Sequence, residues 1–137
     1  MATHLADTSA LARVHHDDVA ARLSPLFLGG QVATCGVVDL EVLVTARDAS
    51  EHEEMWFERQ LLPRAPVTEA ATDRAIEVQA ELCAVGGHRA VPITDLIIAA
   101  AAEQAGLTVL HYDRDFDRIG EVTGQPMEWV VPRGTVP

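Results

Sequence analysis

Two residue types are missing from this sequence of 137 residues, which contains neither lysine nor asparagine. All 10 basic residues are therefore arginine. Without lysine, the chain cannot form a Schiff base, build a phosphate-binding loop of the P-loop type or use a serine–lysine pair. Any anion that it binds must be held by arginine, by backbone N–H groups or by a metal ion.

Aromatic residues and cysteines are also scarce. Aromatic residues make up 4% of the chain and hydrophobic residues 48%, so the core must consist mainly of Ala, Val, Leu and Ile. Cys35 and Cys83 lack CxxC spacing, which favours a reduced, cytoplasmic setting over a disulfide framework. No apolar run approaches the length of a membrane span, so we expect a soluble protein with no membrane partner.

Positive charge is limited as well: 21 acidic residues face 10 basic ones, for a formal net charge of −11. Such a charge argues against nucleic-acid binding, because phosphate contacts require positive surface. That argument fails if several acids bind a divalent metal ion, which reverses the local charge. The length predicts a single domain over residues 1–137, with residues 132–137 as a loose tail.

Short apolar runs alternate with longer segments of helical periodicity, which is typical of an α/β domain with a mostly parallel sheet. We expect strands over residues 3–6, 31–35, 65–67, 107–112 and 128–131. We expect helices over residues 36–47, 51–62, 69–85 and 95–105. Ser50 and Glu53 would form a capping box at the second helix, and Thr68 and Thr94 would cap the third and fourth.

Four carboxylates occupy related places on this skeleton. Asp7 follows the first expected strand and Asp113 the fourth, and the carboxyl ends of parallel strands lie along one edge of a sheet. Asp95 lies at the start of a helix, and Glu41 lies farther along another. Asp39 cannot share a pocket with Glu41, because two positions along a helix turn a side chain by roughly 200°. We expect the other four acids to converge on one catalytic, metal-binding site.

Each acid has a structural explanation as well. Asp7 and Asp113 suit a helix cap or a turn, Asp95 suits the positive end of a helix dipole, and Glu41 suits a solvated helix face. If the acids do converge, two unit charges 4 Å apart repel by about 4 kcal/mol at an effective dielectric constant near 20. Such a cluster persists by taking up protons or by binding metal, and oxygen ligands favour Mg²⁺ or Mn²⁺ over zinc.

The run of alternating acids from Asp113 to Asp117 suggests two other sites. An EF-hand loop requires Gly at its sixth position and Glu at its twelfth, where this chain has Arg118 and Gly124. A haloacid-dehalogenase motif begins with an apolar strand and a DxD sequence, but too little chain follows for the rest of that active site. Both hypotheses are therefore set aside.

The acidic positions match the motifs of a known family. Asp7-Thr8-Ser9 after a short strand, Glu41 on the next helix, the helix over residues 94–102 and the segment over residues 113–119 resemble PIN-domain ribonucleases, particularly VapC-type toxins. The resemblance implies a three-layer α/β/α PIN fold with a mostly parallel sheet, a Mg²⁺ or Mn²⁺ site and endonucleolytic cleavage of RNA. It also implies a homodimer and neutralisation by a cognate antitoxin protein.

The resemblance assigns roles to particular residues. Asp7, Glu41, Asp95 and Asp113 map to the catalytic, metal-binding acids, with Asp115 as a possible fifth. A serine or threonine often precedes the fourth acid in the family, whereas this chain has Tyr112 after His111, so Asp113 would lack the hydrogen bond that a serine or threonine offers.

Arginines that could neutralise the phosphates of RNA, or form only structural ion pairs, are Arg13, Arg47, Arg89, Arg114 and Arg118. The segment Met55-Trp56-Phe57 could either pack in the core or form an antitoxin-binding surface extended by Leu61 and Leu62.

Two other functions remain open. One is an inactive PIN-like protein-binding module, and the other is a different Mg²⁺-dependent phosphoryl-transfer enzyme, although a receiver domain would need a lysine.

Overall fold

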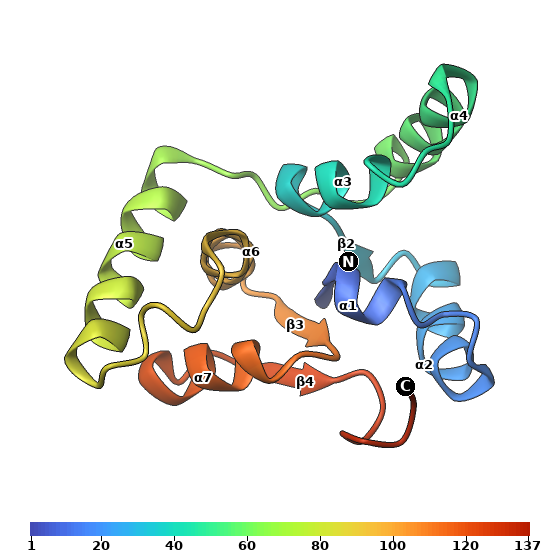
Figure 1. The fold of residues 1–137 in the computed structure, drawn as a ribbon. Coiled ribbons are helices and arrows are strands. Elements are labelled where there is room, and N and C mark those ends of the chain that lie inside the picture. Colours follow the sequence, from blue (N-terminus) through green and yellow to red (C-terminus); the bar gives the residue numbers. More distant parts are fainter.

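The computed structural model describes residues 1–137 and contains a four-stranded sheet in the order β2-β1-β3-β4 (Figure 1). The strands are β1 (His4–Ala6), β2 (Val32–Ala33), β3 (Thr108–His111) and β4 (Met127–Trp129). All three strand pairings are parallel, and Leu5 of β1 lies opposite both Ala33 and Val109. The carboxyl ends of β1 and β3 therefore lie side by side, which brings Asp7 close to the end of β3.

The helices surround this sheet (Figure 1). They are α1 (Thr8–Leu11), α2 (Asp17–Leu28), α3 (Gly36–Leu43), α4 (Ala49–Gln60), α5 (Glu69–Ala84), α6 (Ile93–Gln104) and α7 (Arg114–Thr123). Helix α5 illustrates how the sequence forms them. The Thr68 hydroxyl accepts from the Ala71 N–H, and the buried side chains that follow recur at helical spacing, from Ala71 to Leu82.

Two hydrophobic clusters cover the two faces of the sheet. Along β3, Val109 belongs to the larger cluster and Leu110 to the smaller one, because successive strand residues point to opposite faces. The larger cluster takes residues from α3, α5, α6 and α7, and the smaller takes Val19 and Leu23 from α2. The expected layered α/β arrangement with a parallel sheet is confirmed.

The expected strand over residues 65–67 is wrong. Its place holds a single parallel bridge between Thr34 and Arg64, made by the hydrogen bonds of Thr34 N to Pro63 O and Ala65 N to Thr34 O. Pro63 and Pro66 flank the bridge, and proline has no N–H to extend a ladder.

Several element boundaries also differ from those expected. Helix α4 begins after Asp48, whose carboxylate accepts from the Glu51 N–H, so the capping box of Ser50 and Glu53 is wrong. The expected helix over residues 36–47 ends at Leu43, and α6 begins at Ile93 rather than after Thr94. Helices α2 and α7 were not expected. Each nevertheless buries two residues at helical spacing, Val19 and Leu23 in α2 and Phe116 and Ile119 in α7.

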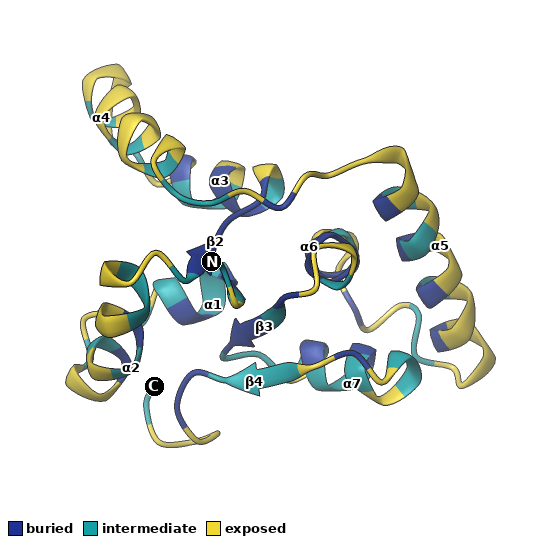
Figure 2. Cartoon of the chain, turned by 180° about the vertical axis from the view of Figure 1, so that it is seen from behind, coloured by how far each residue is buried: buried dark blue, intermediate teal, exposed yellow.

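Two parts of the chain differ in how they contact the body. No residue of α4 is buried, and the helix projects from the rest of the molecule (Figure 2). Residues 132–137, expected to be a loose tail, are hydrogen-bonded through Val136 and Gly134 to the Tyr112 hydroxyl.

No helix is both long and apolar enough to span a membrane.

Candidate metal-binding and catalytic site

Asp7 and Asp113 occupy equivalent positions at the ends of two adjacent strands. Asp7 follows β1 and caps α1, with Oδ2 accepting from the Ser9 N–H at 2.9 Å. Asp113 follows β3 and caps α7, with Oδ1 accepting from the Asp115 N–H at 2.9 Å. Each cap uses one carboxylate oxygen and fixes the orientation of the group. The structural and the chemical explanations of these acids are therefore compatible, because the second oxygen of each has no hydrogen bond.

Asp95 lies in the first turn of α6, where the helix dipole favours a negative charge. Its side chain is buried, with the residue 7% exposed, and Oδ2 has no hydrogen-bond partner. A buried carboxylate oxygen without a partner costs free energy, roughly 1–3 kcal/mol or more for a charged group. This unsatisfied atom is the kind of group that a bound cation would satisfy.

Asp95, Asp113 and Asp115 form the tightest acidic group, with one carboxylate oxygen of each within 4.8 Å of the others. Burial, followed by the negative charges of Asp7 and Asp113, raises the pKa of Asp95 to about 8. Burial and the charge of Asp113 also raise the pKa of Asp115. The structure thus brings Asp115, expected only as a possible fifth acid, into the same group as Asp95 and Asp113.

Glu41 lies beside this group rather than in it. Its Oε1 accepts from the Thr8 hydroxyl at 3.3 Å, and burial together with the charge of Asp7 raises its pKa. Asp39, two residues earlier on α3, is buried elsewhere against Arg59 and Arg64. The opposite orientation expected for these two acids is confirmed.

Two residues that position the site were not singled out from the sequence. Thr8 orients Glu41, and the Ser9 hydroxyl accepts from the Tyr112 N–H at 2.9 Å, which joins α1 to the end of β3. The signal was present in the Asp7-Thr8-Ser9 motif. Their partners, however, lie far along the chain and could not be identified before folding.

The donors of this cluster fit a hard divalent cation. They are all carboxylate oxygens, which suit Mg²⁺ or Mn²⁺, and no histidine or cysteine belongs to the group. The unpartnered Oδ2 of Asp95 gives a specific position that a cation would satisfy. Arg118 donates to Asp115 at 3.0 Å and offsets only part of the negative charge. We conclude that these residues could hold a metal ion.

The arginines expected to contact RNA are dispersed. Arg118 pairs with Asp115, and Arg47 pairs with Glu51 on the exposed surface of α4. Arg13, Arg89 and Arg114 have no Asp or Glu partner. Of these, Arg13 and Arg114 line a cleft beside Asp113, whereas Arg89 is exposed in the segment between α5 and α6.

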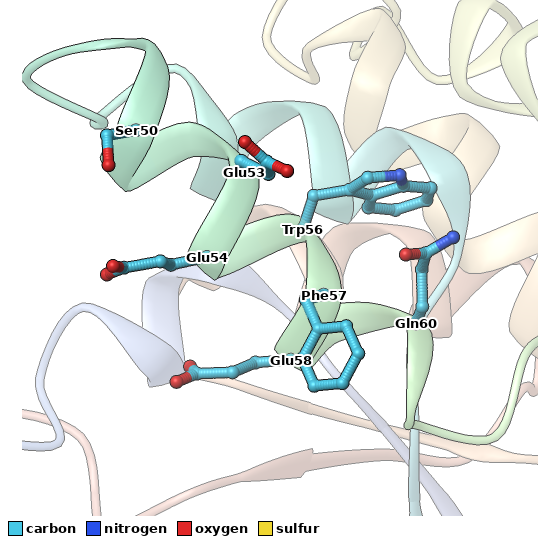
Figure 3. A pocket seen from close by; sticks show the side chains of 7 residues that line it. All are labelled: Ser50, Glu53, Glu54, Trp56, Phe57, Glu58 and Gln60. Atoms are coloured by element: carbon cyan, nitrogen blue, oxygen red, sulfur yellow. The ribbon is translucent and has the colours of Figure 1, made fainter.

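The aromatic segment expected to bind a partner lies on α4, outside the core. Phe57 is 65% exposed and Trp56 is 36% exposed, and both project from the helix among the carboxylates of Glu53, Glu54 and Glu58 (Figure 3). Trp56 also lines an apolar groove with Leu40 and Leu43 of α3. Met55 and Leu62 line a separate hollow, and Leu61 is 72% exposed.

A family model described as the PIN domain matches residues 5–122 of this chain. Two curated relatives from Mycobacterium tuberculosis match almost the full length of both chains. Ribonuclease VapC21 (strain CDC 1551 / Oshkosh) is 45% identical over 133 residues, covering 96% of each chain. Ribonuclease VapC18 (strain ATCC 25618 / H37Rv) is 44% identical over 132 residues, covering 95% of this chain and 96% of the relative.

Solved structures share the fold at low sequence identity. A chain of DNA-bound VapBC from Salmonella typhimurium has a TM-score of 0.75 and 19% identity, and the match covers 96% of this chain and 100% of that one. A chain of VapBC-5 from Mycobacterium tuberculosis, a member of the VapBC family of toxin–antitoxin systems, has a TM-score of 0.65 and 21% identity, and the match covers 94% of this chain and 99% of the other.

Proposed function

The chain belongs to the PIN-domain family, among its VapC ribonucleases, and from that premise we propose that it is an endoribonuclease that requires Mg²⁺ or Mn²⁺. We further propose that it is a cytoplasmic toxin and that a cognate antitoxin neutralises it. The observation that carries the catalytic proposal is Asp95, a buried carboxylate with an unpartnered oxygen, facing Asp113 and Asp115.

We assign the reaction to the acidic cluster. When bound by these carboxylates, a divalent ion would lower the pKa of a water molecule and neutralise charge on the phosphodiester. Asp95, Asp113 and Asp115 would hold the ion most directly, with Asp7 and Glu41 beside them. The chemistry would be hydrolysis of an RNA phosphodiester: the oxygen of water bonds to phosphorus, the P–O bond to one ribose oxygen breaks, and that oxygen takes up a proton.

The chain's own residues keep these acids in place. Ser9 N–H holds Oδ2 of Asp7, and Asp115 N–H holds Oδ1 of Asp113, so each acid has one oxygen fixed and one free. Thr8 holds Glu41 by its hydroxyl. This fixed arrangement reduces the reorganisation needed when substrate arrives.

We place the antitoxin contact on α4 and the adjoining groove. Trp56, Phe57 and Met55 offer aromatic and sulfur-containing side chains of the kind that anchor protein interfaces. The surrounding glutamates would favour a basic or mixed partner helix. We also propose that the chain forms a homodimer, as expected for this family.

The catalytic proposal is tested by incubating the purified protein with a panel of RNAs in Mg²⁺, in Mn²⁺ and in EDTA. We expect cleavage only with metal, and its loss in Asp95→Asn and Asp7→Asn, each of which keeps the fold. Asp73→Asn is the matched control, because it removes one carboxylate from the exposed surface of α5. Full activity in purified Asp95→Asn, or no metal-dependent cleavage by the wild type, would contradict the proposal.

A further inference from the structure

The arginines of this acidic chain divide into two groups. Those paired with a carboxylate are Arg22, Arg47, Arg59, Arg64, Arg74 and Arg118. Those without an Asp or Glu partner are Arg13, Arg89, Arg114 and Arg133. In a chain with a net charge of −11, the unpaired arginines are the sites where a polyanion can meet uncompensated positive charge.

Three of these unpaired arginines line one cleft of about 550 Å³. Its wall is formed by α1 and the residues that follow it, the end of β3, the start of α7, the end of β4 and the C-terminal segment, and it includes Tyr112, Asp113 and Trp129 beside the three arginines. Asp113 belongs both to this cleft and to the acidic cluster with Asp95. The cleft therefore adjoins the proposed catalytic site.

The C-terminal segment forms one side of the cleft because Tyr112 holds it. The Tyr112 hydroxyl donates to Val136 O at 2.8 Å and accepts from the N–H groups of Gly134 and Val136 at 2.9 and 3.2 Å. Arg13 Nε donates to Pro137 O at 3.0 Å. These contacts place Arg133, from the same segment, at the edge of the cleft.

Aromatic rings lie beside these charges. The Arg13 guanidinium lies 4.7 Å from the centre of the Tyr112 ring, and that of Arg133 lies 5.7 Å from the centre of the Trp129 ring. The two rings meet edge to face at 5.2 Å. Aromatic rings and guanidinium planes are the surfaces on which unpaired bases stack, while arginines contact the phosphates.

We propose that this cleft binds nucleotides of single-stranded RNA next to the bond that is cleaved. The inference rests on the proposed ribonuclease function and adds to it a substrate-binding surface, with Tyr112 as the residue that positions Arg133. Single-stranded RNA fits because its bases are free to stack, whereas the bases of a duplex are already stacked on each other. Arg114 and Arg133 contact phosphates, and Trp129 offers a stacking face.

Binding and cleavage are measured separately. Cleavage of the RNA panel by wild type with Mg²⁺ or Mn²⁺ tests the ribonuclease function. Binding of a fluorescein-labelled single-stranded RNA of mixed sequence, followed by anisotropy at several salt concentrations in the Asp95→Asn background, tests the cleft. Thermal melting confirms that each variant is folded.

We expect Arg114→Gln and Arg133→Gln each to weaken RNA binding by roughly tenfold and to reduce the slope of log K against log salt concentration by about 0.7. Arg74→Gln is the control for charge. It removes the same charge from α5, where Arg74 pairs with Glu103. Glu103 lies in the last turn of α6, at the other end of the helix from Asp95. The control should change RNA binding by less than about twofold, since it removes no phosphate contact.

Tyr112→Phe tests the positioning role, since it keeps the ring and removes the hydroxyl that holds the C-terminal segment. It should weaken binding several-fold, and adding Arg133→Gln should then have little further effect, because both changes remove the same contact. Additive effects would contradict the positioning role.

If the wild type cleaves RNA while the Arg114 and Arg133 variants bind RNA as the control does, the cleft is not the binding surface and the ribonuclease function stands. If the wild type neither binds nor cleaves RNA with metal present, the function fails, and this inference fails with it.

Discussion

Replacing Asp95 by asparagine is expected to stabilise the metal-free protein. The carboxyl of Asp95 is buried, its Oδ2 has no partner, and its neighbours include Asp7, Asp113 and Asp115. Burial first, and then these negative charges, raise its pKa to about 8 from the ordinary value of 3.8. The folded protein at neutral pH must therefore keep a proton on Asp95 that the unfolded chain releases.

The size of the effect follows from this difference in pKa. A carboxyl with a raised pKa in the folded state contributes full stability below about pH 4, and this contribution is lost progressively as pH rises toward 8. Each pH unit in this window costs about 1.4 kcal/mol, so the loss amounts to roughly 2 kcal/mol at pH 5 and about 4 kcal/mol at pH 7. Asparagine is neutral at every pH, so Asp95→Asn should recover most of this loss.

The assay is urea unfolding in EDTA at pH 5, 6, 7 and 8. The free energy of unfolding of Asp95→Asn should exceed that of wild type, and the difference should grow with pH. Asp39→Asn is the matched control, because Asp39 is also a buried aspartate, with 2% of its surface exposed. Burial raises the pKa of Asp39, but hydrogen bonds from Arg64, Arg59 and Thr34 outweigh burial and lower it.

The control should therefore have the opposite sign. Asp39→Asn leaves Arg59 and Arg64 without their carboxylate, and breaking a buried pair in this way costs about 3–5 kcal/mol. An Asp95→Asn variant that is less stable than wild type at pH 8, or a difference that does not change with pH, would refute the electrostatic argument.

Two further predictions concern metal and partner. Mg²⁺ binding measured by calorimetry should be tighter at pH 8 than at pH 6, because the ion must displace the proton that the raised pKa of Asp95 retains. Affinity that is independent of pH over this range would contradict it. Trp56→Ala should leave RNA cleavage unchanged and the protein folded, since no residue of α4 is buried. It should weaken antitoxin binding by about 2 kcal/mol in a titration of the purified partners. A variant that unfolds would contradict this prediction, because it would show that the ring packs in the core.

Much of the fold could be predicted from local patterns in the sequence. The apolar stretch before Asp113, bounded by Gly106, gives β3, and the spacing from Ala71 to Leu82 gives the buried face of α5. These patterns succeed because strand and helix periodicity are properties of neighbouring residues. The positions of Asp7 and Asp113 at strand ends followed from the same patterns.

Boundaries and weak helices were harder to predict. Helix α7 is short, and Phe116 and Ile119 are the two residues that it buries in the larger core. The apparent strand over residues 65–67 has suitable composition, but the prolines on either side allow only one bridge to Thr34. The packing of α7 on the core and the hydrogen bonds between residues 65–67 and a neighbouring strand both depend on residues distant in the sequence.

The sequence by itself determined the family, the parallel α/β architecture and the acids that follow strands, because each depends on residue type and local spacing. Only the tertiary structure decided which charges meet. It paired Asp39 with Arg59 and Arg64, left Arg114 and Arg133 free beside Tyr112, and placed Asp115 against Asp95. These outcomes depend on contacts between segments far apart in the chain. Whether an ionisable group is neutralised, shifted in pKa or left free is set by its neighbours in space.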